Sequence, residues 1–469
     1  MTATSTTPSN RSTAYRVVNP ATGEVLEEFP TATDDQVAQA LAGAQAAFET
    51  WKDVPIEERA KVVTRIAELF TERADELAAI ITEEMGKPLS ESKGEVEFCA
   101  DIFTYFAENG PELAADQPIK PINGGRAVIQ KLPVGVLLGI MPWNYPYYQV
   151  ARFAAPNLML GNTIILKHAE NCPRSALALQ QLMDDAGVPA GGYTNVFATH
   201  GQIADIIADP RVQGVSLTGS ERAGAAVAEI AGRNLKKVVL ELGGSDPYII
   251  LDTPDVKAAA EAAFATRMGN TGQACNSNKR IIVTEDLFEG FVAELTALAK
   301  GLVPGDPMAE EPGTFAPLSS AAAADALVAQ INDAVEKGAV LHAGGRRIDG
   351  PGAYVEPAVL TGITPEMRAY REELFGPAVV VYQVADDDEA VRLANDSDYG
   401  LGAAVFSTDE DRARAVANRL QSGMAAVNAA EGEGADMPFG GVKRSGYGRE
   451  LGPLGMDEFV NKRLLYIAD

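Results

Sequence analysis

The spacing of apolar residues changes along the chain and separates a helical first part from an alternating remainder. Over residues 34–85 apolar positions recur every three or four residues, which predicts amphipathic helices, and another helix is expected over residues 90–109. After Val134, short apolar runs bounded by glycine, proline or polar residues alternate with amphipathic stretches. Buried strands that alternate with helices are typical of parallel sheets. The pattern therefore predicts an α/β fold with two such units in succession.

Composition narrows the class of protein without identifying a substrate. The 469-residue chain is 46% hydrophobic, as expected for a globular protein of two or three domains. Its net charge of −26 argues against binding to nucleic acid or to anionic membranes. No apolar run is long enough to cross a bilayer, and the first fifteen residues lack the apolar core of a signal peptide. We therefore expect a cytoplasmic protein with a frayed N-terminal tail.

The cysteines point to catalysis more than to structure. There are three, Cys99, Cys172 and Cys275, and their number and spacing do not suit a disulfide framework or a zinc cluster, so no metal site is expected. Cys275 follows the segment GNTGQA and has polar neighbours on both sides, whereas a structural cysteine usually lies in an apolar run. Cys275 is therefore the candidate nucleophile.

Two further residues have the chemistry that a cysteine nucleophile needs. Asn144 lies in the stiff segment PWNYP, where its side-chain amide could donate to a developing oxyanion; the alternative is an Asx turn. Glu241 ends an apolar strand in VVLELGG, where burial would raise the pKa of its carboxyl group and suit it to act as a general base. The alternative for Glu241 is a backbone cap or a lysine partner.

A dinucleotide site is suggested by two strand ends. In SLTGSERAG a strand is followed by Gly219 and Ser220 and then by a helix, an arrangement that can bind a pyrophosphate but can also be a plain turn. In NTIILKHAE, Lys167 ends a strand and Glu170 follows it. A carboxylate there could accept the ribose hydroxyls and repel a 2′-phosphate, so NAD is predicted over NADP. The alternative is a solvated ion pair in a loop.

In this order, the segments PWNYP, LTGS, LELGG, GNTGQAC, EELFGP and PFGGVKRSGYGRELG resemble the aldehyde dehydrogenase superfamily across nearly the whole chain. The resemblance implies that Cys275 attacks an aldehyde carbonyl, and that the Asn144 side chain and the Cys275 N–H hold the oxyanion. Hydride transfer to a nicotinamide would leave a thioester, and Glu241 would activate the water that hydrolyses it. Glu450, in GRELG, would join a proton relay.

The resemblance also implies a domain organisation. A Rossmann-like NAD-binding domain would cover residues 1–118 and 136–243, and a catalytic α/β domain would cover residues 244–452. A small oligomerisation flap would combine residues 119–135 with residues 453–469, whose segment NKRLLYIAD predicts an edge strand. A homodimer or homotetramer is expected. The residues implied to line the cofactor site are Trp143, Lys167, Glu170, Gly219, Ser220, Leu242, Gly243, Glu373 and Phe375.

Within the superfamily, LKHAE and LELGGSDPYII are most similar to bacterial succinate-semialdehyde dehydrogenases. Such a substrate needs a cation for its distal carboxylate. Arg152 follows Asn144 by eight residues and looks like a carboxylate-binding arginine of that subgroup, and Tyr148 would line the same tunnel. The alternative for Arg152 is an ion pair with an acid elsewhere. The acids Glu431, Glu433 and Asp436, in a loop expected at the substrate mouth, do not favour an acidic aldehyde.

Other functions compete with this interpretation. The substrate could be another aliphatic or aromatic aldehyde. A CoA-acylating semialdehyde dehydrogenase would typically lack the carboxylate at Glu241, because water must not compete with CoA. A non-redox thiol hydrolase would not need the dinucleotide segments, and a purely structural protein would not need Cys275 and Asn144.

Overall fold

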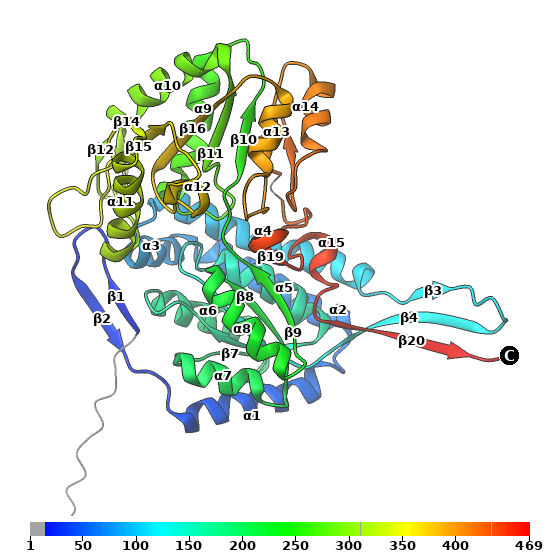
Figure 1. Ribbon diagram of the computed structural model, residues 1–469. Helices are drawn as coiled ribbons and strands as arrows, with labels where there is room; N and C mark the ends of the chain where they lie inside the picture. Colours follow the sequence, from blue (N-terminus) through cyan, green and yellow to red (C-terminus); the bar gives the residue numbers. More distant parts are fainter. Residues whose placement is uncertain (1–14, 310, 433) are drawn as a thin grey trace, which may run out of the picture.

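The computed structural model describes residues 15–309, 311–432 and 434–469, and it contains two large sheets packed between helices (Figure 1). The predicted N-terminal tail and Glu433 lie outside the described residues. Both sheets are mainly parallel, which confirms the predicted α/β class. Within the described ranges no helix combines the length and the apolar character that a membrane crossing requires.

The first sheet has six strands in the order β19-β9-β8-β5-β6-β7. Its parallel strands are β5 (Val136–Ile140), β6 (Thr163–Lys167), β7 (Tyr193–Asn195), β8 (Val212–Thr218) and β9 (Lys237–Glu241), with β19 (Gly446–Tyr447) antiparallel at one edge. From β5 the chain builds outward through β6 and β7, and then returns to add β8 and β9 on the other side. Ligands of such sheets bind at the carboxyl ends of the strands where this direction reverses. A site is therefore expected beyond the ends of β5 and β8.

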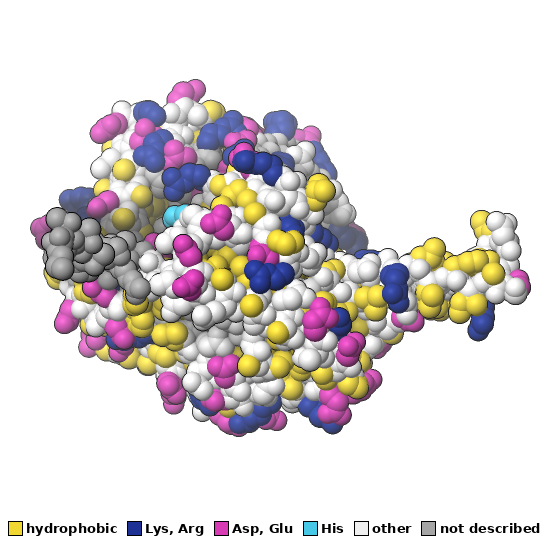
Figure 2. Space-filling model, turned by 90° about the horizontal axis from the view of Figure 1, so that it is seen from below, with side chains coloured by type: hydrophobic (Ala, Val, Ile, Leu, Met, Phe, Trp, Pro, Cys, Tyr) yellow, Lys and Arg dark blue, Asp and Glu magenta, His cyan; other side chains and the backbone are white. Residues whose placement is uncertain are grey.

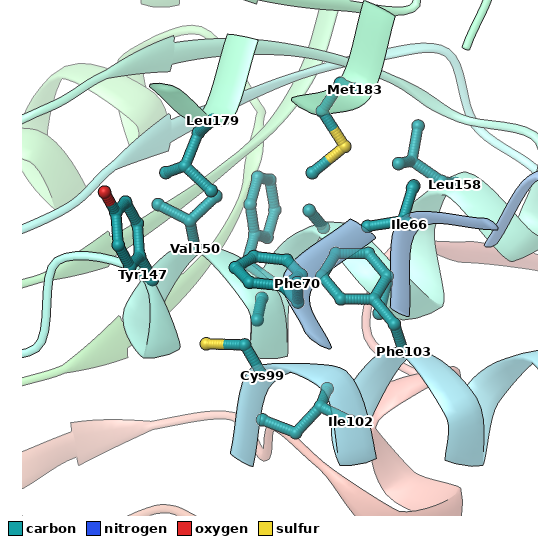
Figure 3. Close-up of a cluster of buried hydrophobic side chains, with 14 of the residues drawn as sticks. Ile66, Phe70, Cys99, Ile102, Phe103, Tyr147, Val150, Leu158, Leu179 and Met183 are labelled. Carbon is teal, nitrogen blue, oxygen red and sulfur yellow. The ribbon is translucent and has the colours of Figure 1, made fainter. Parts of the chain in front are cut away.

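Helices cover both faces of this sheet because its strands are apolar on both sides. Val136 and Leu138 of β5 enter one core, and Leu137 between them enters another. The helices are α1 (Asp34–Trp51), α2 (Ile56–Glu72), α3 (Ala74–Met85), α4 (Leu89–Leu113), α5 (Tyr148–Leu160), α6 (Pro173–Asp185), α7 (His200–Ala208) and α8 (Glu221–Arg233). Figure 3 shows the larger core, where Phe70 of α2 and Phe103 of α4 stack with ring centroids 5.7 Å apart.

The second sheet has seven strands in the order β14-β15-β16-β11-β10-β17-β18. Its strands are β10 (Pro247–Ile250), β11 (Arg280–Thr284), β14 (Val340–Ala343), β15 (Ala358–Thr361), β16 (Ala378–Val384), β17 (Ala404–Phe406) and β18 (Ala426–Val427). Around it lie α9 (Val256–Met268), α10 (Glu285–Lys300), α11 (Ala321–Glu336), α12 (Arg368–Arg371), α13 (Asp387–Asn395) and α14 (Glu410–Ala417). Only the edge strand β14 is antiparallel. The second predicted α/β unit is thus present.

Short elements complete the chain. They are β1 (Tyr15–Val18), β2 (Val25–Phe29), β12 (Val303–Pro304), β13 (Thr314–Phe315), α15 (Gly452–Gly455) and the 3₁₀ turns η1 (Gly269–Gly272) and η2 (Lys443–Ser445). A third sheet, β20-β4-β3, projects from the body as a narrow arm that carries exposed apolar side chains (Figures 1 and 2). Its strands are β3 (Gln117–Ile119), β4 (Arg126–Pro133) and β20 (Val460–Ile467). The predicted C-terminal strand is therefore present, while the division into domains stays a prediction.

The two large sheets meet where the candidate residues lie. The chain leaves the carboxyl end of β9 at Glu241 and enters the amino end of β10 at Pro247. Cys275 lies shortly before Arg280, which begins β11 beside β10. The carboxyl edge of the first sheet and the amino edge of the second therefore contribute to the same region.

Candidate active site

A strained turn carries the cysteine. Asn270, Thr271 and Gly272 of η1 all have left-handed backbone angles, with φ of 49°, 53° and 74°. Such a conformation is costly for residues other than glycine and persists only where neighbours hold it. Gly272 packs against the carbonyl of Gly376, which leaves no room for a Cβ atom. Arg267 at the end of α9 donates to the Gly272 carbonyl over 3.0 Å and so holds the turn in place.

The backbone of Cys275 is held as firmly as the turn. The Nζ atom of Lys279 donates to the carbonyls of Ala274 and Cys275, each over 2.7 Å. Gly244, in the crossing from the first sheet to the second, packs so closely on the Cys275 carbonyl that a side chain there would collide with it. Cys275 is partly exposed as a residue, whereas Cys99 and Cys172 are buried. Of the three thiols, Cys275 is thus the one that a small reactant can reach.

Charged side chains surround the Cys275 thiol and act on it in opposite directions. Withdrawal from water raises the pKa of the thiol to about 12, although Arg152 and Lys279 lower it. Glu373 and Glu241 add to the increase. The resting thiol is therefore protonated near neutral pH, and its reaction with an electrophile needs removal of that proton.

Asn144 faces the cysteine loop from the end of β5. Its side-chain amide donates to the Gln273 carbonyl over 3.0 Å, and the Asn270 amide donates to the Asn144 carbonyl over 2.8 Å. The two loops thus exchange hydrogen bonds across more than a hundred residues of sequence. These contacts bind Asn144 to the cysteine loop through its side-chain amide and its carbonyl. An amide has two hydrogens, so one stays available for an oxyanion beside Cys275.

Glu241 ends β9 with a buried carboxylate that has no hydrogen-bond partner among the described residues at either oxygen. Gly440 lies directly against it, since a Cβ atom there would be 2.7 Å from the Glu241 Oε1 atom. Burial raises the pKa of Glu241 well above its usual value; Arg152 opposes this increase and Glu450 adds to it. A carboxylate without partners in such surroundings suits a base that acts through a bound water.

Arg152 and Glu450 form a buried ion pair next to Glu241. The guanidinium of Arg152 also donates to the Thr218 hydroxyl over 3.2 Å and to the Tyr148 hydroxyl over 3.4 Å. Burial alone would lower the pKa of Arg152, but Glu450, Tyr148 and Glu241 more than offset this and raise it. The arginine is thus paired with an acid of the same chain, which is the alternative that the sequence left open, and its predicted contact with a substrate carboxylate stays a prediction.

Lys167 and Glu170 lie at the end of β6 but interact loosely. Their nearest charged atoms are 4.0 Å apart, and the lysine side chain is only 10% exposed against 42% for the glutamate. The Lys167 Nζ atom also lies 5.5 Å from the centre of the Tyr15 ring. Burial lowers the pKa of Lys167, and Glu170 opposes that decrease. A buried cation at a strand end with one distant partner can accept an anion such as a phosphate.

The segment after β8 serves the start of α8. The Ser220 hydroxyl accepts from the Ala223 N–H over 3.3 Å and so caps the helix, and the Gly219 N–H donates to the Glu241 carbonyl over 2.9 Å. Leu242 is buried and packs on Gly224, where a side chain would not fit. The Ser220 end of the helix lies at the point where the strand order reverses, as a dinucleotide site requires.

Glu373 and Phe375 approach from the second sheet. The Glu373 carboxylate accepts from the Gly244 N–H over 3.0 Å and lies 3.0 Å from the Lys279 Nζ atom. A Cβ atom at Gly243 would be 2.5 Å from this carboxylate, so a larger residue there would displace the Glu373 side chain. The ring of Phe375 meets Trp143 edge to face with centroids 5.7 Å apart. These contacts bring the two sets of predicted cofactor residues together.

The sequence did not identify several polar residues that complete the site. Lys279 donates to the Cys275 carbonyl and pairs with Glu373. In the sequence, the one feature that could have identified it is its position directly before an apolar strand. Ser216, in the middle of β8, donates to Glu450 over 3.1 Å from an otherwise apolar run. Asn276, the residue after Cys275, donates to Glu431, which is one of the acids in the loop expected at the substrate mouth. Among the described residues no group of His, Cys, Asp or Glu side chains is arranged to hold a metal ion.

The sequence is similar over nearly its whole length to proteins of known family. A sequence profile of the Aldehyde dehydrogenase family matches residues 6–465. A Deinococcus radiodurans protein named succinate-semialdehyde dehydrogenase, NADP(+), is 54% identical over 466 residues, which cover 99% of this chain and 97% of that protein. A Mycobacterium tuberculosis protein named succinate-semialdehyde dehydrogenase, NADP(+), 1 is 41% identical over 454 residues, covering 96% of this chain and 99% of the relative.

A solved structure agrees with the sequence relatives. Succinic semialdehyde dehydrogenase from Streptococcus pyogenes, in complex with NADP⁺ as the cofactor, superposes with a TM-score of 0.94 at 43% identity, covering 97% of this chain and all of the other.

These relatives correct the predicted cofactor. The choice of NAD over NADP is wrong, because the relatives are named for NADP⁺ and one was solved with it. The sequence argument gave Glu170 too much weight. Its carboxylate is 42% exposed and 4.0 Å from Lys167, so water screens its charge and the side chain is loosely held. The neighbouring buried lysine supplies the opposite charge, which a 2′-phosphate can use.

Proposed function

This chain belongs to the aldehyde dehydrogenase family and is an NAD(P)-dependent aldehyde dehydrogenase; from that premise we propose that it oxidises succinate semialdehyde to succinate with NADP⁺. The family and fold class expected from the sequence are confirmed. The proposed substrate and cofactor are supported by the names of relatives that share up to 54% of their residues with this chain over nearly its full length.

One observation carries the chemistry. The thiol of the partly exposed residue Cys275 lies where its pKa is influenced by both Arg152 and Glu241, while the Asn144 side chain is bonded to the same loop. A nucleophile, a hydrogen-bond donor and a carboxylate without partners are thus gathered at the junction of the two sheets. This combination supports acyl chemistry on an aldehyde and makes a purely structural role a poor explanation.

Cys275 is the proposed nucleophile. Once its proton has passed to solvent water, the sulfur attacks the aldehyde carbonyl carbon and forms a thiohemiacetal. Arg152 and Lys279 favour the thiolate because both lower the pKa of the thiol. The negative charge that develops on the former carbonyl oxygen is stabilised by the free hydrogen of the Asn144 amide and by the Cys275 N–H. Loss of hydride from this adduct leaves a thioester on Cys275.

Glu241 is the proposed base for the second half of the reaction. Its raised pKa and the absence of a hydrogen-bond partner at either oxygen suit it to take a proton from the water that attacks the thioester. Hydrolysis releases the carboxylic acid and restores the thiol. Because a CoA-acylating enzyme must exclude this water, a carboxylate at position 241 favours hydrolysis. Glu450 is proposed to exchange protons with Glu241, with Arg152 between them.

We place NADP⁺ beyond the carboxyl ends of β5, β6 and β8, where ligands of such sheets bind. Lys167, a buried cation with one loose partner, and the start of the thirteen-residue helix α8 at Ser220 would bind its phosphates. Glu373, Phe375 and Trp143 would flank the nicotinamide end, and Gly243 allows the Glu373 carboxylate to lie close to the backbone there. When bound, NADP⁺ supplies the hydride acceptor.

We also propose a homodimer or homotetramer in the cytoplasm. The arm formed by β3, β4 and β20 exposes Ile119, Leu464, Tyr466 and Ile467, and a thin projecting sheet cannot bury both of its faces alone. Free thiols at all three cysteines are compatible with a reducing compartment.

The proposal is tested with the purified protein, NADP⁺ and succinate semialdehyde, by following the absorbance of NADPH. We expect turnover with NADP⁺ in the absence of CoA, and a higher kcat/KM for succinate semialdehyde than for pentanal, which has similar length and no carboxylate. Faster oxidation of pentanal would contradict the proposed substrate, and a requirement for CoA would contradict hydrolysis. Preference for NAD⁺ would contradict the proposed cofactor.

A further inference from the structure

One face of α4 contacts both of the loops that form the site. Glu91 and Glu95 are four residues apart in this helix and therefore point to the same side. Glu91 reaches the turn before Cys275, and Glu95 reaches the loop that carries Asn144. The reaction described above makes no use of either residue.

Glu95 holds the start of α5. Its Oε1 atom accepts from the N–H groups of Tyr147 and Tyr148, over 2.8 and 3.1 Å, where a helix has backbone donors without partners. Its Oε2 atom is paired with Lys87, and both side chains of this ion pair are fully buried. The Lys87 ammonium also lies 3.6 Å from the centre of the Tyr145 ring, the residue next to Asn144. The Asn144 loop is thus held at two points, by Glu95 of α4 and by Lys87, which lies two residues before this helix.

Glu91 holds the other loop. Its Oε2 atom accepts from the Asn270 N–H over 2.6 Å, at the first of the three left-handed residues. The Asn270 side chain in turn donates to the Asn144 carbonyl. The connection therefore runs from Glu91 through Asn270 to Asn144 itself.

A buried ion pair such as Lys87–Glu95 contributes little to stability compared with apolar residues of similar size, because both charges lose their hydration. What it does provide here is a fixed geometry, with one oxygen of Glu95 for two backbone donors and the other for Lys87. We propose that Glu91, Glu95 and Lys87, which we call the α4 clamp, are positioning residues that set the Asn144 amide relative to Cys275. This inference rests on the proposed oxyanion role of Asn144.

Glu91 gives the cleaner test, because it lies at the surface and its replacement leaves no buried charge. Glu91→Ala removes the acceptor for the Asn270 N–H, and we expect kcat to fall about 10-fold, since small displacements of catalytic groups have effects of this size. The KM for NADP⁺ should not change. Glu91→Gln keeps an acceptor and should restore most of the rate. Glu97→Ala, an exposed glutamate of the same helix, is the matched control and should leave kcat unchanged.

The clamp must act through Asn144, and a double-mutant cycle tests this requirement. If the inference is correct, Glu91→Ala should cost much less in an Asn144→Ala background than in the wild-type chain. Equal losses in both backgrounds would overturn the proposal and leave Glu91 with a general structural role. A wild-type rate in Glu91→Ala would also overturn it.

The buried half of the clamp needs a variant that removes both charges. Lys87→Met combined with Glu95→Gln keeps the acceptor oxygen for Tyr147 and Tyr148 and eliminates the ion pair. We expect a folded protein with kcat lowered by about the same factor and with the pH profile unchanged. If this double variant retains full kcat, the ion pair is not part of the clamp.

The alkylation rate of Cys275 by iodoacetamide separates failure of this inference from failure of the proposed function. Loosening of the turn in Glu91→Ala should change this rate at least about threefold relative to Glu97→Ala, with the buried Cys99 and Cys172 as unreactive references in the same mass spectrum. If wild-type protein oxidises no aldehyde but the alkylation rates differ, the proposed function fails and the clamp stands. If turnover is normal and the rates are equal, the clamp fails alone.

Discussion

Two arginines, Arg152 and Arg267, are both completely buried, yet their surroundings differ in kind. Arg267 lies under the cysteine turn and donates to the carbonyls of Ala378, Gly272 and Leu374 over 2.6 to 3.0 Å. It also donates to the Ser277 hydroxyl over 2.8 Å. Burial lowers the pKa of Arg267 to about 10, because these partners are neutral and only Glu373 opposes the decrease.

Arg152 has anionic neighbours instead. It pairs with Glu450, and Glu241 and the Cys275 thiol both lie close enough to raise its pKa. Two buried carboxylates thus share one cation, and the oxygens of Glu241 have no hydrogen-bond partner among the described residues.

This difference in partners indicates different roles: the Arg267 region supports the fold, and the Arg152 region takes part in the reaction. Around Arg267 the donors of the guanidinium meet backbone acceptors, which fixes a turn that would otherwise be strained. Around Arg152 the charges are not balanced, and groups of this kind change protonation easily. Substitutions in the Arg152 region should therefore alter the reaction and its pH dependence, whereas substitutions in the Arg267 region should alter folding.

The largest expected effect is that of Cys275→Ala. Removal of the nucleophile should lower aldehyde oxidation by roughly four orders of magnitude or more, because no other described side chain can form the thioester. The melting temperature should change little, since Cys275 is a partly exposed residue and its backbone contacts are kept. Steady-state NADPH formation and a thermal melt check both points, and Cys99→Ala serves as the control for loss of a thiol.

Glu241→Gln should come next, with steady-state turnover lower by about 10²- to 10⁴-fold. The first half of the reaction does not need this base, so a burst of NADPH close to one equivalent of protein should precede the slow phase. Rapid-mixing absorbance measurements detect that burst. Loss of the burst together with the steady state would show that Glu241 acts before the thioester forms.

The same variant has a predictable effect on stability. In the folded protein the pKa of Glu241 lies above its ordinary value near 4.5, so the folded state binds a proton more tightly than the unfolded state. Wild-type stability should therefore fall as the pH rises above 4.5, and Glu241→Gln should lack this part of the decrease. Urea denaturation at several pH values checks the direction.

The sequence predicted the helices and strands of the fold more completely than the contacts within the site. The three- and four-residue periodicity of residues 34–85 and the short apolar runs after Val134 identified helices and parallel strands, because burial on one or both faces leaves a local pattern. Strand order could not be read in this way. That β5 lies between β6 and β8 depends on packing between distant segments.

Cys275, Asn144 and Glu241 could be proposed from the sequence because the chemistry needs a particular residue type within a segment, and their roles stay predictions. Contacts between distant segments could not be predicted from the sequence. The ion pair of Arg152 with Glu450, for example, joins residues almost three hundred positions apart. The cofactor prediction failed for a related reason. It judged Glu170 by charge alone, and the exposure that weakens this charge depends on the folded surface.

Arg267→Met should affect stability more than chemistry. It leaves the carbonyls of Gly272, Leu374 and Ala378 without their donor in a buried place, at a cost of about 3 kcal/mol in the free energy of unfolding. Urea denaturation measures this loss. At a temperature where the variant is still folded, its pH profile should match that of the wild type. Arg346→Met, a change at an exposed arginine, is the control.

The smallest effect belongs to Arg152, and it decides between two roles for this residue. Arg152→Gln combined with Glu450→Gln removes the cation without leaving the Glu450 carboxylate unpaired. Arg152 lowers the pKa of Cys275, so its loss should raise the pKa of the thiol. For Glu241 the loss of Arg152 raises the pKa and the loss of Glu450 lowers it, so the two changes oppose each other and the thiol decides the outcome. Since the deprotonated forms react, the pH profile of kcat should move by about one unit to higher pH, with a roughly 10-fold lower rate at pH 7.

Pentanal and succinate semialdehyde should be affected alike, because a change in protonation does not depend on the distal end of the substrate. If Arg152 instead binds that distal carboxylate, KM should rise for succinate semialdehyde alone and the profile should stay in place, which would move Arg152 from the charge balance of the site to substrate recognition.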